Sequence, residues 1–160
     1  MAGSSTPAAG TGAKAERHDG GCLCGAVRFT VHGPLRALWL CHCSQCRKWT
    51  GNAVAATAVR PGRFTLADPT AALGWYAASD HAERGFCRTC GSSLFWRPRA
   101  GDRISILAGS FDGATGLTPV GHVFVGEAAD WEILDERLPR HDALPGEGDP
   151  MGGFDGGGRG

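Results

Sequence analysis

The sequence predicts a mainly β domain, and three observations support this prediction. Short segments rich in apolar and β-branched residues recur through the middle of the chain. Glycine and proline separate these segments at short intervals, as is typical of turns between strands. Only residues 131–138, WEILDERL, have a helical pattern, and that segment is brief. Many short strands between turns favour a β fold over a helical one.

The expected strands follow one another in chain order. AVRFTVH, residues 26–32, alternates apolar with other side chains and ends at Gly33-Pro34, a pattern typical of a strand and its turn. Residues 36–41 are apolar and lead into a loop with three cysteines. Residues 53–60 fit a strand or a buried helix, and the glycine and proline around them favour a strand. The remaining expected strands are residues 63–66, 93–97, 103–110 and 122–125.

The chain of 160 residues suits one domain with its own core. Residues 1–18 offer little to bury and are predicted to be a disordered tail. The Gly-rich residues 141–160 are predicted to be a second tail, so the globular part spans residues 19–140. The beginning of the chain has no apolar core of a signal peptide, which favours the cytoplasm.

The net charge of the chain indicates which classes of partner it attracts. The formal net charge is zero and the sequence pI is about 7.0. A strongly basic surface, which nucleic acids and anionic membranes attract, is therefore not expected. No apolar stretch reaches the roughly 18 residues that cross a bilayer. We expect neither nucleic acid nor a membrane as a partner.

Seven cysteines carry the strongest signal in the sequence. They are Cys22, Cys24, Cys41, Cys43, Cys46, Cys87 and Cys90. An odd number cannot pair completely as disulfides, and C-x-C or C-x-x-C neighbours in a reducing compartment are typical of metal ligands or redox groups. A redox C-x-x-C needs a βαβ context, and neither C-x-x-C has one. We therefore expect metal ligands.

Zinc is the metal that such cysteines favour, because thiolates two or three residues apart can bind one tetrahedral ion. Seven ligands divide into four, which close a structural site, and three, which leave the open position of a catalytic site. Spacing alone leaves the division open. The pairs at 43–46 and 87–90 could form a zinc ribbon, which spacing slightly favours. Alternatively, the pair at 22–24 joins the pair at 87–90, and the cysteines at 41–46 form a triad.

Five segments resemble one family in their order. They are GCLCGAVRF, CHCSQCRKWTG, GFCRTCGSSLFW, AGSFDG and GHVFVGEAADW. From about Gly20 to Pro139, the chain resembles the glutathione-dependent formaldehyde-activating enzymes, also called the CENP-V/GFA family. The resemblance implies an Mss4-like fold of antiparallel sheets.

The resemblance also implies two zinc ions per chain and a division of the ligands between them. The structural zinc is implied to bind Cys22, Cys24, Cys87 and Cys90. The catalytic zinc is implied to bind Cys41, Cys43 and Cys46, which would also be the catalytic residues.

The activity implied by the resemblance is that of a carbon–sulfur lyase acting on small molecules, a glutathione-like thiol and an aldehyde. The thiol of glutathione adds to formaldehyde and gives S-(hydroxymethyl)glutathione. A metal deprotonates a coordinating thiol, and the thiolate is the nucleophile. Arg47 and Lys48 directly follow the triad and are expected to contact the carboxylates of glutathione. Arg28 and Arg84 are weaker candidates for this role.

Several other residues have roles that the sequence leaves open. Alternate residues of an extended loop point in opposite directions, so His42 is expected to face away from the metal. His122 matches a family histidine and fits either a pocket or a sheet edge. Asp112 matches a family aspartate and fits an Asx turn. Trp49 fits a pocket wall or the core. Tight loops with backbone N–H contacts to sulfur are expected at Gly25, Gly51 and Gly91.

Two alternative functions remain compatible with the same residues. The fold could act on a different carbon–sulfur substrate, because fold does not fix function. The chain could also be a non-catalytic, zinc-stabilised binding module.

Overall fold

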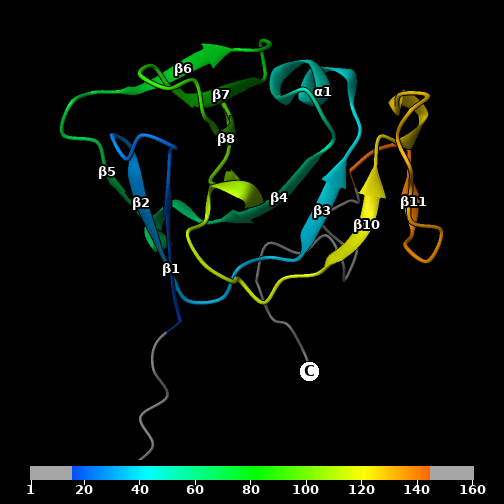
Figure 1. Cartoon of the computed structure of the whole chain (residues 1–160), viewed down its shortest axis with the longest axis horizontal. Helices are drawn as coiled ribbons and strands as arrows, with labels where there is room; N and C mark the ends of the chain where they lie inside the picture. The colour runs from blue at the N-terminus through cyan, green and yellow to red at the C-terminus, as the bar shows by residue number, and fades with distance from the viewer. Residues whose placement is uncertain (1–15, 145–160) are drawn as a thin grey trace, which may run out of the picture.

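Two β-sheets form the described part of the chain, residues 16–144 of a computed structural model (Figure 1). One sheet has three strands in the order β1-β2-β5, and the other has eight in the order β11-β10-β3-β4-β9-β8-β7-β6. The strands are β1 (Arg17–Gly21), β2 (Arg28–His32), β3 (Leu38–Cys41), β4 (Val54–Val59), β5 (Phe64–Ala67), β6 (Leu73–Ala77), β7 (Ala82–Cys87), β8 (Ser93–Pro98), β9 (Ile104–Leu107), β10 (Pro119–Val123) and β11 (Arg140–His141). The helices are α1 (Ser44–Thr50) and the short 3₁₀ turns η1 (Pro61–Arg63), η2 (Ala108–Ser110) and η3 (Val125–Glu127).

The core lies between the small sheet and the large one. Alternation along β2 and the residue before it buries Val27, Phe29 and Val31, which are at most 2% exposed. The Phe29 ring lies 5.8 Å from the Phe64 ring and 5.3 Å from the Phe95 ring, measured between centroids. Phe95 belongs to β8, so these aromatic contacts join the two sheets. Burial of such apolar area is the main force that holds them together.

The large sheet is mostly antiparallel and places the three-cysteine segment beside its centre. Cys41, the last residue of β3, lies opposite Val54 of β4, and Ala56 of β4 lies opposite Leu107 of β9. β10 runs parallel to β3, with Val123 opposite Cys41. α1 follows β3 closely and lies beside β4 (Figure 1). The mainly β prediction is confirmed.

The predicted helix at residues 131–138 is wrong, because this segment forms turns and irregular structure. Two of its large apolar residues face solvent: Trp131 is 55% exposed and Ile133 is 96% exposed. The buried side chain is that of Glu132, which is 3% exposed. The segment is held against the domain by a polar contact between Glu132 and His42, not by an amphipathic helical face.

The boundaries of the ordered chain also differ from the prediction. β1 begins at Arg17, which lies opposite His32 of β2, so the predicted tail 1–18 overlaps a strand. β11 ends at His141, which lies opposite Val123, so the domain extends past residue 140. The rest of both predicted tails, residues 1–15 and 145–160, lies outside the described residues.

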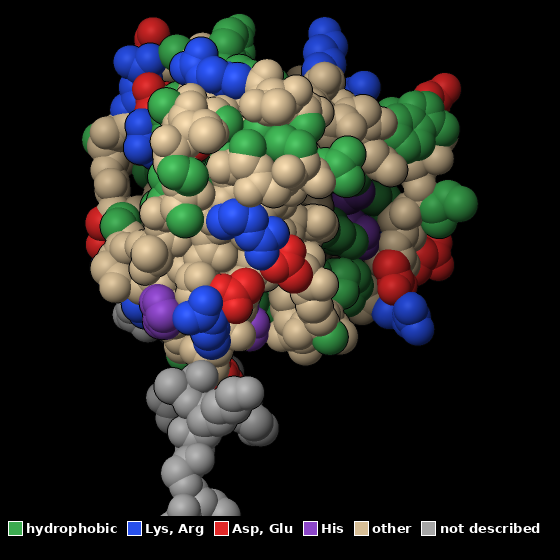
Figure 2. Space-filling model, turned by 60° about the vertical axis from the view of Figure 1, so that its left-hand side comes forward, with side chains coloured by type: hydrophobic (Ala, Val, Ile, Leu, Met, Phe, Trp, Pro, Cys, Tyr) green, Lys and Arg blue, Asp and Glu red, His purple; other side chains and the backbone are tan. Residues whose placement is uncertain are grey.

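Charge is mixed over the surface that Figure 2 shows, where Lys and Arg side chains are interspersed with Asp and Glu. This distribution agrees with a formal net charge of zero. Between residues 16 and 144, every helix is too short to cross a membrane. The expectation that nucleic acids and membranes are not partners stays a prediction.

Candidate metal centres and active site

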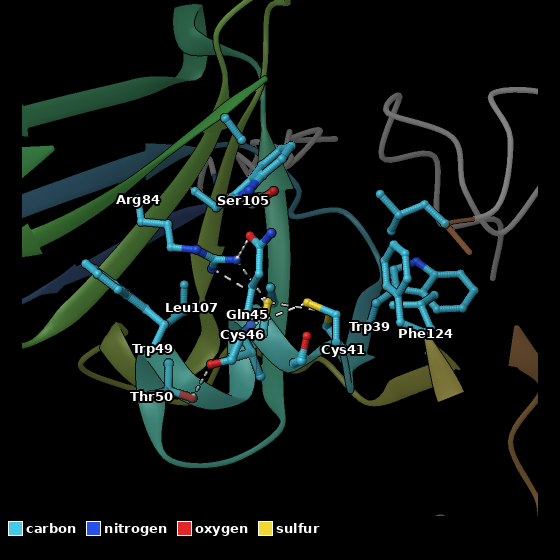
Figure 3. A pocket seen from close by; sticks show the side chains of 18 of the residues that line it. Trp39, Cys41, Gln45, Cys46, Trp49, Thr50, Arg84, Ser105, Leu107 and Phe124 are labelled. Atoms are coloured by element: carbon cyan, nitrogen blue, oxygen red, sulfur yellow. Dashed lines mark hydrogen bonds between the residues drawn. The ribbon is translucent and has the colours of Figure 1, made fainter. Parts of the chain in front are cut away.

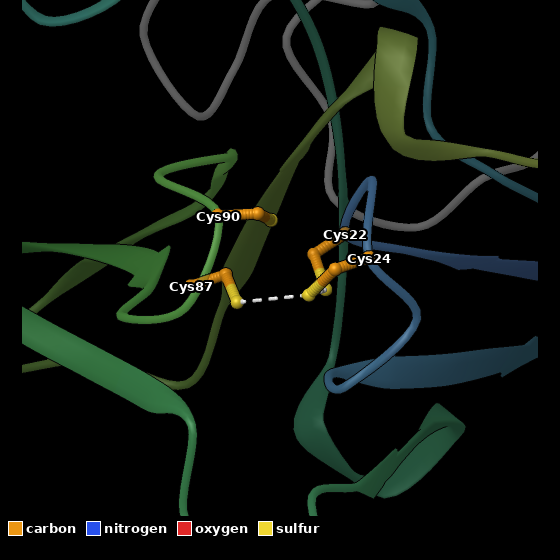
Figure 4. Close-up of side chains that lie close together, drawn as sticks. All are labelled: Cys22, Cys24, Cys87 and Cys90. Carbon is orange, nitrogen blue, oxygen red and sulfur yellow. Dashed lines mark hydrogen bonds between the residues drawn. The ribbon is translucent and has the colours of Figure 1, made fainter.

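Four cysteines from the two sheets come together in one cluster. Cys22 and Cys24 lie in the turn after β1, Cys87 ends β7, and Cys90 lies in the turn before β8. Their four sulfur atoms all lie within 4.8 Å of one another. The sulfurs of Cys22 and Cys24 are 3.5 Å apart, and those of Cys24 and Cys87 are 3.8 Å apart (Figure 4). The structure therefore groups the cysteines as 22–24 with 87–90, not as a ribbon of 43–46 with 87–90.

This four-sulfur cluster fits zinc by its donors and their spacing. Zinc–sulfur bonds of about 2.3 Å in a tetrahedron place sulfur atoms about 3.8 Å apart, close to the distances found here. The Ser92 hydroxyl lies 3.2 Å from the Cys90 sulfur and lowers the pKa of that thiol to about 5. The thiolate is the form that binds metal. Four sulfur donors complete a tetrahedron, which is typical of a structural site.

The glycines beside the cysteines adopt the left-handed conformation that their positions require. Gly25, Gly51 and Gly91 have φ of 80°, 84° and 77°. Their own N–H groups donate to carbonyl oxygens three or four residues earlier, not to sulfur, and close the predicted tight loops. Residues close to two of the glycines contact sulfur through their N–H groups: Val27 donates to Cys22 at 3.2 Å, and Ala26 and Ser92 donate to Cys24 and Cys90. The Cys46 N–H group donates to the Cys43 sulfur at 3.4 Å.

The remaining three cysteines form a second cluster around the start of α1. Cys41 ends β3, Cys43 is the N-cap of α1, and Cys46 lies in the first turn of that helix. Their sulfur atoms lie within 4.8 Å of one another, and those of Cys41 and Cys46 are 3.5 Å apart. The donors and spacing again fit zinc, with one tetrahedral position left for another ligand. The expected loop is a helix here, because the Cys43 side chain caps it and Gly51 ends it.

The electrostatics of this triad favour thiolate at Cys43. Hydrogen bonds from Cys41 and Cys46 lower the pKa of Cys43, and the contact with Cys43 raises the pKa of Cys41. Arg84 on β7 is 6% exposed and directs its guanidinium at the cluster. Its two terminal nitrogens lie 3.6 and 3.7 Å from the Cys46 sulfur (Figure 3). A buried cation at this distance stabilises negative charge on sulfur.

The triad opens into a pocket of about 370 Å³. One face of the large sheet forms its floor, since the lining residues of each strand alternate along the chain. These floor residues include Trp39 and Cys41 of β3, Val54 and Ala56 of β4, and Ser105 and Leu107 of β9. α1 contributes Gln45, Cys46 and Trp49 to the wall, and the Arg84 guanidinium donates to the Gln45 side-chain oxygen as well as facing Cys46 (Figure 3).

The predicted cations directly after the triad do not line this pocket. Arg47 instead lies 3.6 Å from the Glu132 carboxylate and donates to the Glu127 carbonyl oxygen at 3.3 Å. Lys48 is exposed on α1. Arg84, one of the two weaker candidates, lines the pocket. Arg36 and Arg103, which the sequence did not indicate, line it as well.

The other weak candidate, Arg28, lies away from the triad. It forms an ion pair with Asp112 near Cys22 and Cys24, in a separate polar hollow. The Asx turn expected at Asp112 is therefore wrong, since its carboxylate binds a guanidinium 84 residues earlier in the chain. Trp49 takes the expected pocket-wall role rather than a core role, because it lines the pocket and its ring stacks at 5.6 Å on Tyr76, which is 56% exposed.

A buried polar network lies on the other side of the triad segment. The His42 ring faces away from the three sulfurs, as expected, and its Nε2 lies 2.8 Å from His122 Nδ1. Its Nδ1 contacts the Glu132 carboxylate. The side chains of His42 and Glu132 are 4% and 3% exposed. This network fixes the backbone that carries Cys41 and Cys43. Glu132 was missed because nothing in the pattern of its segment marks a buried acid.

We expect Glu132→Ala to lower the free energy of unfolding by about 2–3 kcal/mol, because it leaves His42 and the Ala129 N–H group buried without their acceptor. Ile133→Ala is a matched control one residue away, since this side chain is 96% exposed. It should change the free energy by less than about 0.5 kcal/mol. Urea unfolding followed by tryptophan fluorescence measures both. Equal effects would contradict a structural role for the network.

The pH dependence of the same contact has a defined sign. Burial raises the pKa of Glu132, but hydrogen bonds from His42 and Ala129 lower it more, so it lies below its ordinary value. The side-chain carboxyl group of an unfolded glutamate has a pKa of about 4.3. The contact therefore stabilises the fold above that pH, and this contribution is lost as the pH falls through the lower folded value. The stability difference between wild type and Glu132→Ala should shrink over that range.

Comparisons with known proteins show which family this chain resembles. Residues 17–127 match the family model described as glutathione-dependent formaldehyde-activating enzyme. A Halomonas elongata protein, named provisionally as a glutathione-dependent formaldehyde-activating enzyme, is 30% identical over 128 residues, which cover 74% of this chain and 82% of the relative. A Schizosaccharomyces pombe protein, named only as an uncharacterized lyase, is 29% identical over 114 residues, or 71% of this chain and 82% of the relative.

A solved structure is also similar. A crystal structure of a Rhodobacter sphaeroides protein aligns with 60% of this chain and 89% of its own at 24% identity, with a TM-score of 0.45. The family match covers more than half of the chain and includes both cysteine clusters. The chain therefore belongs to the glutathione-dependent formaldehyde-activating enzyme family.

Proposed function

We propose that this protein is a zinc-dependent carbon–sulfur lyase that adds a glutathione-like thiol to formaldehyde or a related aldehyde. The observation that carries the proposal is the division of the cysteine sulfurs into three and four. Three sulfurs beside a pocket would leave one position of a tetrahedral zinc ion for a substrate, whereas the four sulfurs of the other cluster would fill all positions of a second zinc ion. Family membership and a relative named as a lyase support the reaction class. The proposal includes two zinc ions per chain, bound by the triad and by the four-sulfur cluster.

The reaction breaks the S–H bond of the thiol and the π bond of the carbonyl group, and it forms a C–S bond and an O–H bond. The sulfur of the thiol bonds to the carbonyl carbon, the π electrons move to oxygen, and oxygen takes a proton. The reverse reaction breaks the carbon–sulfur bond. When bound, zinc would keep the incoming thiol deprotonated at neutral pH, where a free thiol of pKa about 8.5 is mostly protonated.

The residues around the triad are suited to this chemistry. Arg84 lies against Cys46 and reduces the cost of gathering negative sulfurs in one place. Trp39 and Leu107 give the pocket an apolar floor, which limits the water that competes for the aldehyde. His42 and Glu132 hold the segment between the ligands in position. We expect the cytoplasm as the location, because glutathione keeps thiols reduced there.

The test is the rate at which glutathione and formaldehyde exchange with their adduct, followed by NMR exchange spectroscopy with and without protein. We expect the zinc-loaded protein to exceed the spontaneous rate and chelator-treated protein to lose this excess. A panel of thiols against formaldehyde then identifies the preferred co-substrate. Rates equal to the background with every thiol would contradict the proposal and favour a non-catalytic zinc module. If only a thiol other than glutathione accelerates the exchange, that thiol is the substrate and the proposed reaction class stands.

A further inference from the structure

Two arginines enter the pocket at the end opposite the triad. Arg103 directly precedes β9, and its position alternates with Ser105 and Leu107, which both line the pocket floor. Arg36 lies two residues before β3 and also lines the pocket. The antiparallel register places the start of β3 and the start of β9 at the same edge of the sheet. Cys41 lies at the other end of β3.

The separation between the two ends follows from strand geometry. Cys41 lies five positions after Arg36, and a strand rises about 3.3 Å per residue, so their backbones are at most about 16 Å apart. Both side chains reach into the pocket, which shortens the gap between guanidinium and sulfur. A small molecule in an extended conformation can therefore contact the triad with one end and the arginines with the other.

The two guanidiniums are close enough to affect each other. Partial burial and repulsion from Arg103 lower the pKa of Arg36 to about 10. Arg103 also lies over the Trp96 ring, with Cζ 5.1 Å from the centroid, which fixes its direction. Two cations that repel each other in a partly desolvated pocket are stabilised by an anion that contacts both. Guanidiniums bind carboxylate and phosphate oxygens in a bidentate way.

We propose that Arg36 and Arg103 form an oxyanion subsite that selects the thiol substrate. The thiol carries a carboxylate or phosphate on an extended chain, with its sulfur at the triad and its oxyanion at the two arginines. This inference rests on the proposed function, because it assigns the far end of the substrate in the same pocket. The subsite uses residues other than Arg47 and Lys48, which were expected to contact the carboxylates of glutathione but do not line this pocket.

Binding measurements with thioethers test the subsite apart from catalysis. S-methylglutathione and its diethyl ester have the same chain, and neither can form a thiolate. Isothermal titration of the zinc-loaded protein should show the acid binding at least about 10-fold more tightly than the ester. Arg36→Met and Arg103→Met should remove this difference, and Arg36→Lys should keep part of it. Arg17→Gln is the control, since Arg17 is exposed in the small sheet. It should bind like wild type.

Two matched pairs of thiols identify the oxyanion by steady-state kinetics with formaldehyde. Glutathione and its diethyl ester differ in carboxylates, whereas 4′-phosphopantetheine and pantetheine differ in a phosphate. For the charged member of the preferred pair, Arg36→Met or Arg103→Met should raise KM about 10- to 100-fold. For the neutral member, KM should change less than about twofold.

The outcomes separate this inference from the proposed function. The subsite would be overturned, and the lyase kept, if the protein turned over every thiol and the arginine variants raised KM equally for the charged and the neutral members. Absence of turnover, together with tighter binding of the charged thioether that the variants lose, would overturn the lyase and keep the subsite. Circular dichroism checks that the variants fold, and Arg36→Lys separates lost charge from lost packing.

Discussion

Cys87→Ala should unfold much of the domain and remove one zinc ion per chain. Cys87 is fully buried and ends β7, while its cluster partners Cys22 and Cys24 belong to the turn between β1 and β2. With the proposed zinc bound, loss of one ligand would release the metal and leave the other three thiols close together without it. The energy of a structural zinc site is largely folding energy. We expect the free energy of unfolding to fall by more than about 4 kcal/mol.

Thermal unfolding by circular dichroism and zinc content by elemental analysis measure this effect. Cys43→Ser is a matched control, because it removes a ligand from the other cluster. Serine is a favourable N-cap, so this change keeps the hydrogen bond that caps α1 at Cys43. Its unfolding midpoint should stay close to that of wild type. If Cys43→Ser destabilises the protein as much as Cys87→Ala, the division into one structural and one open site is incorrect.

Cys43→Ser should abolish activity while it leaves the fold intact. Cys43 caps α1 and Cys46 lies in its first turn, and hydrogen bonds from Cys41 and Cys46 stabilise the Cys43 thiolate. A serine hydroxyl stays protonated at neutral pH and is a poor ligand for zinc. We expect kcat/KM for adduct formation to fall by at least about 10³-fold, because the site loses its metal and thereby the bound thiol.

The measurement is the same exchange assay, with zinc content determined on the same sample. Zinc should fall by one ion per chain, and added zinc should not restore the rate. Ser44→Ala is a nearby control, since Ser44 contacts Glu127 and its hydroxyl is not a member of either sulfur cluster. Full activity in Cys43→Ser would show that the chemistry does not need the triad.

The sequence predicts best those features that depend on local spacing. Alternation identified β2, and cysteines two or three residues apart identified the halves of the metal clusters, because a short segment fixes both. The division of cysteines between clusters required contact between β7 and the turn after β1. Spacing alone slightly favoured the other division, and the resemblance favoured the one found.

Features that depend on distant contacts were harder to predict. Glu132 is buried only because His42, 90 residues earlier, lies opposite it. Arg36 and Arg103 have no motif of their own, and only the register of β3, β4 and β9 brings them to one edge. α1 was predicted as a loop because seven residues are too few for a visible helical period.

The network of His42, His122 and Glu132 has a practical consequence for protein engineering. The family match ends at residue 127, before Glu132 and before β11. An excised domain cut at that boundary would keep all seven cysteines. It would lose the carboxylate against His42 and the Pro139 carbonyl oxygen that accepts a hydrogen bond from the His122 N–H group at 2.8 Å. The smallest unit worth expressing therefore extends past His141, well beyond the last metal ligand.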